Sequence, residues 1–422
     1  MPEIVKTMKL HLAVSAADSA KLVEITEKYA SVCTYISKYL FDNGIELNAR
    51  KLQDELYHEI RDEYGLKSQF TISAIKTVVA RYKTVATQLE SKPYRYQDEN
   101  GKWISVPKTL DWLWYPIEFK RPQADLVRGR DYSFIEDRTT YKLSLNTLEK
   151  RVKVGFDVPD NFKDYFDGTW KFGTGKIVSL KGEWYFHIPM TKVITKEFQP
   201  DMPKHVVGID RGLRFLATAY DEKGKTTFID GKDILAKREK FQRVRSELQT
   251  KGTKSAKRAL KRISGRENRW MSDVNHSITK TLVQKYGSDT LFVLEDLTGV
   301  SFSNDILSNR SKKDRQSIRT WAFYQFEQDL TYKAQEVSSA VIKVDPKYTS
   351  QRYPKCGRIH KENRKHETHE YICDCCGYRS NDDRIGAMNI QMLGTMYVSG
   401  VDNPKITILK AAKSKAKTKK AG

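Results

Sequence analysis

Several features that define common protein classes are scarce or missing in this sequence of 422 residues. No run of about 18 apolar residues occurs, so we expect no transmembrane helix and no membrane partner. The first residues lack the apolar core of a secretory signal peptide. The chain has only five cysteines, too few for a disulfide-stabilised secreted scaffold. These absences predict a cytoplasmic protein with reduced thiols.

Acidic residues are also in short supply, with 53 Asp and Glu against 75 Lys and Arg, a net charge of +22. A balance this basic indicates a polyanionic partner, either nucleic acid or an anionic membrane surface. With nucleic acid as the partner, we expect association with the nucleoid of a prokaryote. The length predicts about two to four domains, each large enough to bury a core.

The first half of the chain changes its hydrophobic period twice. Residues 1–14 alternate loosely and predict a strand, whereas residues 15–92 follow helical spacing. From 93 to 194, short aromatic and β-branched runs alternate with turn residues, which is typical of a barrel or sandwich. Lys181-Gly182-Glu183 fits a hairpin turn. If the first strand joins these strands, the helical block is an insertion into the barrel.

Two stretches combine basic residues in ways that suit nucleic acid. Within the β region, basic side chains stand among aromatics and glycine, which favours contact with phosphates and bases, with an ordinary polar loop as the alternative; they are Lys120, Arg121, Arg128 and Arg130. After a linker at 195–203, residues 230–272 predict a basic helical hairpin that bends at Lys251-Gly252-Thr253. Its unbalanced charge favours phosphate binding over a solvated helix face, through Lys237, Arg238, Arg243, Arg245, Lys257, Arg258, Lys261, Arg262 and Arg269.

Acidic residues stand at the ends of apolar segments at three places. Asp210 follows Val206–Ile209, and Glu295 follows Thr290–Leu294. Asp382 and Asp383 precede a helical pattern. Each has an ordinary explanation, because Asp is a common turn former and acids suit a helix N-terminus. Alternatively, two strand ends and one helix start could converge in an α/β sheet and hold Mg²⁺ through carboxylates.

The order and spacing of these pieces resemble the RuvC nuclease domain of the TnpB family, the RNA-guided nucleases of IS200/IS605 and IS607 transposons, which are related to miniature Cas12-type CRISPR effectors. The similarity runs from about residue 204 to 392 and more weakly upstream. It is carried by Gly208–Gly212, Asn268–His276, Leu294–Leu297, Trp321–Gln325, Tyr348–Gln351, Asn381–Arg384 and Asn389-Ile390.

The resemblance implies a multidomain α+β protein with a β-barrel wedge, a helical recognition insertion and an RNase H-like (RuvC) α/β nuclease domain that carries a zinc-ribbon-like insert. The implied divisions are 1–14 wedge strand, 15–92 helical recognition domain, 93–194 wedge barrel, 195–203 linker, 204–346 and 380–400 nuclease, 347–379 insert and 401–422 basic tail.

By position, the resemblance assigns catalysis to Asp210, Glu295 and Asp383, rather than to the neighbouring Asp296 and Asp382. These acids would hold two Mg²⁺ ions that stabilise the attacking and leaving oxygens of a phosphodiester. Arg384 could contact the scissile phosphate or pair with Asp382. The implied partners are a guide RNA, from a transposon end or a CRISPR array, and double-stranded target DNA with a short flanking motif. A guided repressor without cleavage and a DNA-joining transposase are the alternatives.

Four of the five cysteines lie within residues 356–376, which favours a metal site over disulfides. Paired C-x-x-C motifs would indicate zinc, but Tyr353 stands where the family has a cysteine. Cys356, Cys373 and Cys376 could still bind Zn²⁺ with His360 as a fourth donor, or the ribbon could form without metal. Residues 302–319 resemble the segment that gates the family's active site. The sequence does not indicate an oligomeric state.

Overall fold

In the computed structural model the chain forms two compact units, one of residues 5–193 and one of residues 194–422 with residues 1–4. The residues described are 3–137, 140–156, 163, 165–194, 196–212, 214–297, 323–365 and 368–406. The predicted gating segment 302–319 and most of the predicted tail lie outside them. Among the described helices, none combines the length and apolarity that a membrane crossing requires.

Three helices follow the first strand of the 5–193 unit, as predicted: α1 (Ala16–Asp42), α2 (Ala49–Tyr64) and α3 (Ser68–Glu90). The hydroxyl of Ser15 and the amide oxygen of Asn48 accept backbone N–H groups at the starts of α1 and α2, which satisfies donors that have no partner within the helix. Their apolar faces meet around the fully buried rings of Tyr29 and Tyr82.

The β part of this unit is one sheet with the strand order β4-β9-β10-β1-β7-β6-β5, and β8 pairs with β10. The edge strands β4 and β5 follow each other in sequence, and a bridge between Arg128 and Tyr132 closes the turn that joins them. The sheet is therefore nearly closed. The predicted barrel with a helical insertion is confirmed at this level. The strands are β1 (Glu3–Ala13), β4 (Gln123–Leu126), β5 (Tyr132–Asp137), β6 (Thr140–Leu145), β7 (Val152–Phe156), β8 (Lys171–Phe172), β9 (Gly175–Leu180) and β10 (Glu183–Val193).

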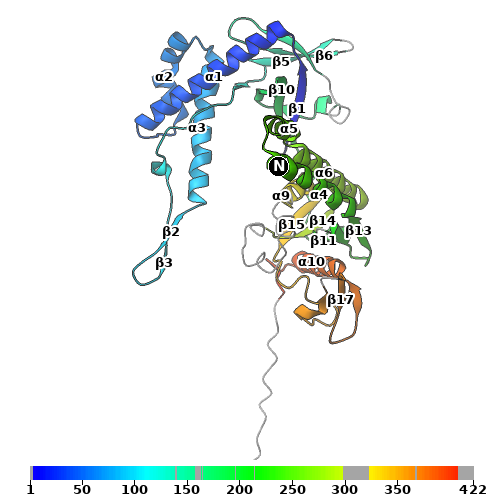
Figure 1. Ribbon diagram of the computed structural model, residues 1–422. Helices are drawn as coiled ribbons and strands as arrows, with labels where there is room; N and C mark the ends of the chain where they lie inside the picture. The colour runs from blue at the N-terminus through cyan, green and yellow to red at the C-terminus, as the bar shows by residue number, and fades with distance from the viewer. Residues whose placement is uncertain are drawn as a thin grey trace, which may run out of the picture. The chain divides into compact units, whose positions relative to one another are not determined.

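A separate two-stranded hairpin follows α3. It consists of β2 (Tyr94–Gln97) and β3 (Trp103–Val106), and the 3₁₀ turn η1 (Leu110–Trp112) comes after it. In Figure 1 the hairpin extends as an arm beyond the end of α3. Its strands pair with each other and with no other described strand.

The second unit is built on a five-stranded mixed sheet in the order β13-β12-β11-β14-β15. Strand β11 (His205–Asp210) pairs antiparallel with β12 (Phe215–Tyr220) and parallel with β14 (Thr290–Glu295). Strands β13 (Thr226–Asp230) and β15 (Ala340–Val344) form the edges. The central strands β11 and β14 are buried along most of their length, because helices cover both faces of the sheet.

Helices α6 (Arg266–Tyr286) and α9 (Phe323–Glu336) pack on one face of this sheet, and α10 (Asp382–Val398) packs on the other, as Figure 1 shows. The basic region precedes α6 as α4 (Lys232–Lys251) and α5 (Lys254–Ile263). Gly252 ends α4 with a left-handed backbone and Thr253 caps α5, so the predicted bend is confirmed. The end of the predicted basic stretch 230–272 belongs to α6, which begins at Arg266.

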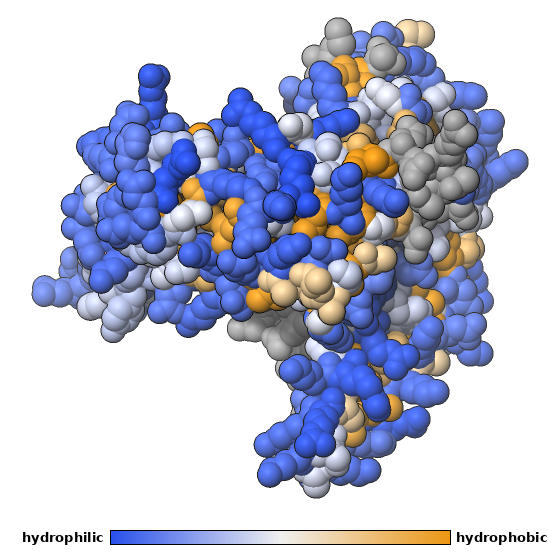
Figure 2. Space-filling model, turned by 90° about the horizontal axis from the view of Figure 1, so that it is seen from above, coloured by the Kyte–Doolittle hydropathy of each residue, from blue (hydrophilic) through white to orange (hydrophobic). Residues whose placement is uncertain are grey.

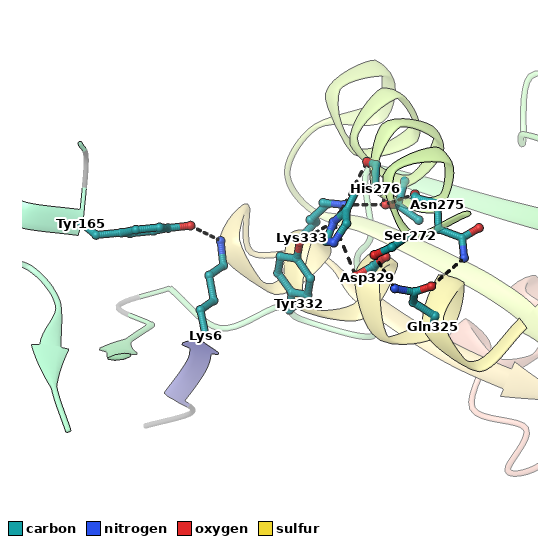
Figure 3. Close-up of polar contacts among 10 residues, drawn as sticks. Lys6, Tyr165, Ser272, Asn275, His276, Gln325, Asp329, Tyr332 and Lys333 are labelled. Carbon is teal, nitrogen blue, oxygen red and sulfur yellow. Dashed lines mark hydrogen bonds and ion pairs between the residues drawn. The ribbon is translucent and has the colours of Figure 1, made fainter. Parts of the chain in front are cut away.

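A polar network joins α6 to α9 (Figure 3). Gln325 donates to Ser272 at 2.6 Å, and the Nδ1 atom of His276 lies 3.1 Å from the Tyr332 hydroxyl and 3.6 Å from Asp329. In the other unit, Figure 3 shows Lys6 donating to the hydroxyl of Tyr165, at 3.3 Å. The α6–α9 network fixes the register of two helices whose apolar faces alone would allow sliding.

Between β15 and α10 the chain forms a small antiparallel sheet in the order β16-β17-β18. The strands are short: β16 (Arg364–Lys365), β17 (Glu370–Ile372) and β18 (Arg379–Asn381), preceded by the 3₁₀ turn η4 (Lys361–Asn363). A small apolar cluster that includes Tyr353, Tyr371 and Ile385 packs this insert against the start of α10.

Candidate active site and thiol cluster

Asp210 and Glu295 leave the same edge of the central sheet. They are the last residues of β11 and β14, two parallel neighbours whose register pairs Ile209 with Leu294. Parallel strands end on the same side, so the two carboxylates lie beside each other. Both keep partial solvent exposure. The sheet therefore presents two adjacent acids at an accessible edge.

The first turn of α10 brings a third acid to the same edge. The side chain of Asn381 caps the helix and accepts the backbone N–H groups of Asp383 and Arg384, at 3.0 and 3.1 Å. Asp383 is 7% exposed. The charges of Glu295 and Asp383 both raise the pKa of Asp210, so the three predicted acids form one electrostatic cluster.

Two glycines allow α10 to approach β11 this closely. A Cβ atom on Gly386 would lie 2.4 Å from Oδ2 of Asp210, and one on Gly208 would lie 2.2 Å from the backbone nitrogen of Gln391. Neither space can hold a methyl group without moving the backbone or the carboxylate. Glycine at these positions is thus part of how the sequence builds the site.

Burial disfavours the charged form of all three acids. Desolvation by the surrounding protein, followed by the charges of Glu295 and Asp383, raises the pKa of Asp210 well above its ordinary value. Burial also raises the pKa of Glu295, and burial with the neighbouring Asp382 raises that of Asp383. Like charges held together in a poorly solvated place favour protons or cations. The arrangement is suited to binding divalent cations.

Two arginines outside the predicted site residues balance part of this charge. The Nε atom of Arg364 lies 2.8 Å from Asp382, which is fully buried, and Nη2 lies 3.6 Å from Asp383. Burial opposes the charge of Arg364, but Asp382, Asp210 and Asp383 raise its pKa overall. Arg211 is 6% exposed and donates to the backbone oxygen of Glu295 at 2.6 Å.

Two residues of the matched motifs hold the acids in place. The hydroxyl of Thr349 shares its hydrogen between Oε1 of Glu295 and the backbone oxygen of Pro346. Asn389, fully buried on α10, donates to the backbone oxygens of Thr349 and Arg352 at 2.7 and 2.6 Å. The start of the insert is thereby tied both to the Glu295 carboxylate and to α10.

Arg384 does not pair with Asp382, one of the two alternatives that the sequence allowed, and its contact with a phosphate stays a prediction. Its guanidinium donates to Thr226 at 2.9 Å and to the hydroxyl of Tyr378 at 2.7 Å. Asp382, its predicted alternative partner, pairs with Arg364 instead. The helix direction explains the difference, because successive residues of α10 project about 100° apart around the axis. Arg364 is the arginine that lies among the carboxylates.

The acidic site has the donors that a hard divalent cation requires. Oδ2 of Asp383 is buried and makes no hydrogen bond to any described residue, and a ligand oxygen of this kind costs free energy unless something binds it. Asp382, Asp383 and the His369 ring also place one potential ligand atom each within 4.8 Å of one another. Carboxylates with unused lone pairs fit Mg²⁺.

A thiol cluster forms in the insert. Cys356, Cys373 and Cys376 place their sulfur atoms within 4.8 Å of one another, with 3.5 Å between the first two. The turns that carry them have the same hydrogen bonds. Gly357 donates to the backbone oxygen of Tyr353, as Gly377 does to that of Cys373. This convergence supports a zinc site at the level of three thiolates.

Tyr353 occupies the position that corresponds to Cys373 in the second turn. Its ring is 4% exposed and stacks on Tyr378, with ring centroids 4.4 Å apart. The tyrosine therefore serves as core where a fourth thiolate would stand. His360 is not in the group of three thiols, and its Nδ1 atom lies 3.5 Å from Asp374. Its role as a zinc ligand stays a prediction.

Most of the predicted nucleic-acid residues are exposed. Lys120, Arg121, Arg128 and Arg130 lie on the surface of the first unit, where Arg128 stacks on Phe172. On α4 to α6 the exposed members are Lys237, Arg243, Arg245, Lys257, Arg258, Lys261, Arg262 and Arg269. Figure 2 shows a face that is mainly hydrophilic, with hydrophobic residues in smaller patches.

Arg238 is the exception among these residues. It is 2% exposed, and its Nε atom lies 3.8 Å from Glu267. The periodicity of α4 turns this side chain inward, so it cannot reach a phosphate at the surface. The prediction for Arg238 is wrong, and its role is to neutralise Glu267 inside the helical region.

Comparison with known proteins identifies relatives of both halves of the second unit. A family model described as "Probable transposase" (OrfB_IS605) matches residues 187–298, and a "Cas12f1-like, TNB domain" model matches residues 323–390. The chain is 28% identical over 250 residues to the CRISPR-associated endodeoxyribonuclease Cas12f1 of Syntrophomonas palmitatica, which covers 55% of this chain and 48% of that protein. It is 29% identical over 229 residues to a TnpB-like protein of Methanocaldococcus jannaschii, which covers 51% and 78%.

The chain spans about half the length of the Cas12f1 relatives that it matches. The fold is shared more widely. A Cas12f1–sgRNA–target DNA complex superposes with a TM-score of 0.60 at 12% identity, covering 92% of this chain and 99% of that one. CasPhi-2 (Cas12j) bound to crRNA gives 0.51 at 13% identity, covering 95% and 99%. These matches make the chain similar to the TnpB/OrfB proteins of IS605 elements and a distant homologue of Cas12f1 and TnpB-like proteins.

Proposed function

We propose that this protein is an RNA-guided endonuclease that cleaves DNA after a guide RNA has paired with the target strand. The observation that carries the proposal is the convergence of Asp210, Glu295 and Asp383 on one edge of the sheet, where burial raises the pKa of all three and the charges of the other two acids further raise that of Asp210. Acids held in this way are unfavourable for the fold alone and are typical of a functional site.

Asp210, Glu295 and Asp383 would hold two Mg²⁺ ions, which when bound activate a water for attack on phosphorus and stabilise the leaving oxygen. The chain's own residues fix the geometry around them. Thr349 orients the Glu295 carboxylate, Asn381 sets the position of Asp383, and Arg364 places a positive charge beside Asp382 and Asp383. Arg364 is thereby positioned to attract a phosphate to the acids.

The exposed basic side chains of α4 to α6 and of the nearly closed sheet would contact the guide RNA and the target DNA. Phosphate contacts of this kind carry no sequence information, so the guide would supply the specificity and the protein would read a short flanking motif. The three thiols would hold Zn²⁺ and fix the insert that leads into α10. Such a protein would act in the cytoplasm, at the nucleoid of a prokaryote.

The proposal is tested with purified protein and the RNA that copurifies with it. Sequencing that RNA gives the guide, and a plasmid that carries its complement is incubated with protein and Mg²⁺. We expect cleavage that stops after RNase treatment and after Mg²⁺ chelation. RNA-dependent binding without cleavage would indicate a guided repressor, and strand joining would indicate a transposase; either result contradicts the nuclease.

A further inference from the structure

The arm, taken as residues 92–115 with β2, β3 and η1, carries several exposed aromatic rings. Isolated apolar residues at a surface are ordinary, but a contiguous group usually marks a binding site. Trp103 is 67% exposed, Trp114 85% and Tyr115 80%. The other members of the group are Tyr94, Tyr96 and Trp112, which are 48%, 40% and 42% exposed.

Three of these rings form a continuous row. Tyr94 and Tyr96 lie on the same face of β2, with centroids 5.9 Å apart and planes 29° from parallel. Trp112 continues the row 5.8 Å from Tyr94, and the ammonium of Lys108 sits 5.4 Å from the centre of the Trp112 ring. We call Tyr96, Tyr94 and Trp112 with Lys108 the aromatic row.

The register of the hairpin explains the row. Tyr94 pairs with Val106 and Tyr96 with Ile104, so alternate residues of both strands share this face. Arg95, Gln97 and Trp103 fall on the opposite face. The arm therefore presents rings and cations to solvent, since all four residues of β2 are exposed.

Charge on the arm favours an anionic strand. The carboxylate of Asp98 accepts the backbone N–H groups of Asn100 and Lys102 in the hairpin turn, and Asp111 accepts the Thr109 hydroxyl. Lys92, Arg95, Lys102 and Lys108 outnumber the three acids Asp98, Glu99 and Asp111 by one, in a chain whose net charge is +22. Rings that alternate with cations along an extended surface are how proteins bind single-stranded nucleic acid, because bases stack on aromatic faces while phosphates meet Lys and Arg.

We propose that the aromatic row is a stacking site for an unpaired segment of RNA. The inference rests on the proposed function for the source of that RNA and deepens it by assigning a base-contacting surface. An RNA with loops and single-stranded ends has bases free to stack, whereas paired bases are hidden within the duplex. The aromatic row would therefore bind unpaired bases without a preference for their sequence.

The experiment uses the full chain, freed of nucleic acid, with a short oligouridine RNA and the same backbone without bases. Fluorescence anisotropy gives both affinities. We expect oligouridine to bind more tightly than the abasic strand, and Trp112→Ala to reduce that advantage by roughly tenfold. Trp112→Phe should retain most of it. The matched control is Tyr324→Ala, since Tyr324 is 74% exposed on α9 and outside the arm.

Equal binding of oligouridine and abasic RNA by the unaltered chain would overturn the proposal, as would an unchanged affinity in Trp112→Ala. A tighter complex with oligodeoxyuridine than with oligouridine would overturn the assignment to RNA. Loss of self-association without loss of RNA affinity in Trp112→Ala would make the row a protein contact instead. Crosslinking of 5-bromouridine RNA, mapped to the arm by mass spectrometry, supplies a readout independent of affinity.

The row and the nuclease can fail separately. If Asp210→Asn binds oligouridine normally and no preparation cleaves DNA, the stacking site is supported and the nuclease activity is contradicted. If guided cleavage occurs but RNA binding does not depend on bases, the nuclease activity is supported and the stacking site is contradicted. If both are right, cleavage by Trp112→Ala recovers when guide RNA is raised to saturation.

Discussion

The three thiols lie between Glu295 and Asp383 in sequence, yet the fold builds the carboxylate site and the thiol cluster in different ways. Asp210, Glu295 and Asp383 stand on a five-stranded sheet and a long helix that pack through glycines. The thiols stand on turns around strands of two and three residues, and Cys356 and Cys376 are exposed. Packing can hold the acids without a metal, whereas the insert has little core of its own.

The ion pairs of the two regions differ in the same way. Arg364 and the fully buried Asp382 form a pair inside the carboxylate site, and Arg358 pairs with Asp374 at the surface of the insert, at 2.7 Å. The two ion pairs have similar distances, 2.8 and 2.7 Å, so distance does not distinguish them. Burial makes the first indispensable, because a charge left alone in the interior costs much more than one left in water.

Replacing these arginines should give the largest contrast. We expect Arg364→Met to lower the free energy of unfolding by about 3–5 kcal/mol, because Asp382 would keep a buried charge without its partner. Arg358→Met is the matched control, and its effect should lie near the error of measurement. Urea unfolding of both variants checks this. Similar losses in the two variants would show that burial does not distinguish the pairs.

The close approach of α10 to β11 makes the next prediction. Gly208→Ala should destabilise the protein by roughly 1–3 kcal/mol, because the added methyl group would meet the backbone of Gln391 and Ala387. Gly155→Ala in β7 serves as the control, since its Cβ would lie 4.0 Å from that of Ala13. Thermal unfolding measures both. Equal tolerance would mean that the helix is less tightly packed than described.

Zinc binding by the thiol cluster can be tested by adding a fourth cysteine at position 353. Tyr353→Cys should bind Zn²⁺ about tenfold more tightly or better, since a fourth thiolate completes the tetrahedron that zinc prefers. Competition with a chromophoric chelator gives the affinity. Cys375→Ser, which alters a cysteine outside the group of three, should leave it unchanged. If Tyr353→Cys binds no better than the natural chain, the two turns do not face one ion.

The smallest effect concerns the charges of the acids themselves. A carboxyl whose pKa is raised on folding keeps its proton to a higher pH in the folded state, so stability falls as pH rises between the unfolded and folded pKa values. Burial and the charges of Glu295 and Asp383 raise the pKa of Asp210. Asp210→Asn should thus stabilise the metal-free protein by about 0.5–2 kcal/mol at neutral pH, and by less as pH falls.

Asp374 gives the opposite sign. The neighbouring Arg358 and Asn363 lower its pKa, so its contribution to stability is present at neutral pH and is lost as pH falls through that lowered value. Asp374→Asn should therefore destabilise the protein slightly, where Asp210→Asn stabilises it. Unfolding curves in a chelating buffer from acidic to neutral pH separate the two. Equal signs would contradict the electrostatic account of the acidic site.

The sequence predicted much of this architecture because local signals were strong. The change from strand to helical period after residue 14, the turn at Gly182 and the bend at Gly252 all lie where the residues indicated. Asp210 and Glu295 were identifiable because apolar strands ended at them. Strand ends reveal which residues reach the sheet edge, but not which side chains arrive there from elsewhere.

What the sequence could not predict depends on tertiary pairing. Arg364 reaches Asp382 only because β16, β17 and β18 fold back on one another, and two- and three-residue strands leave no readable pattern. Arg384 is adjacent to Asp383 in sequence but points to Thr226 and Tyr378. Arg238 has basic neighbours in sequence, but its position on the turn of α4 buries its side chain. For the pairing of Arg384 with Asp382 and for Arg238, the neighbouring residues in sequence gave the wrong prediction.

Guided cleavage by the unaltered protein and by Asp210→Asn, each loaded with the copurified RNA, tests the account most directly. The substitution keeps the shape of the side chain and removes one metal-binding oxygen. We expect cleavage to fall by about 1000-fold or more, the scale of losing several kcal/mol of metal-assisted stabilisation, while RNA-dependent target binding stays the same. Undiminished cleavage, or a loss of binding that matches the loss of cleavage, would contradict a catalytic role for the three acids.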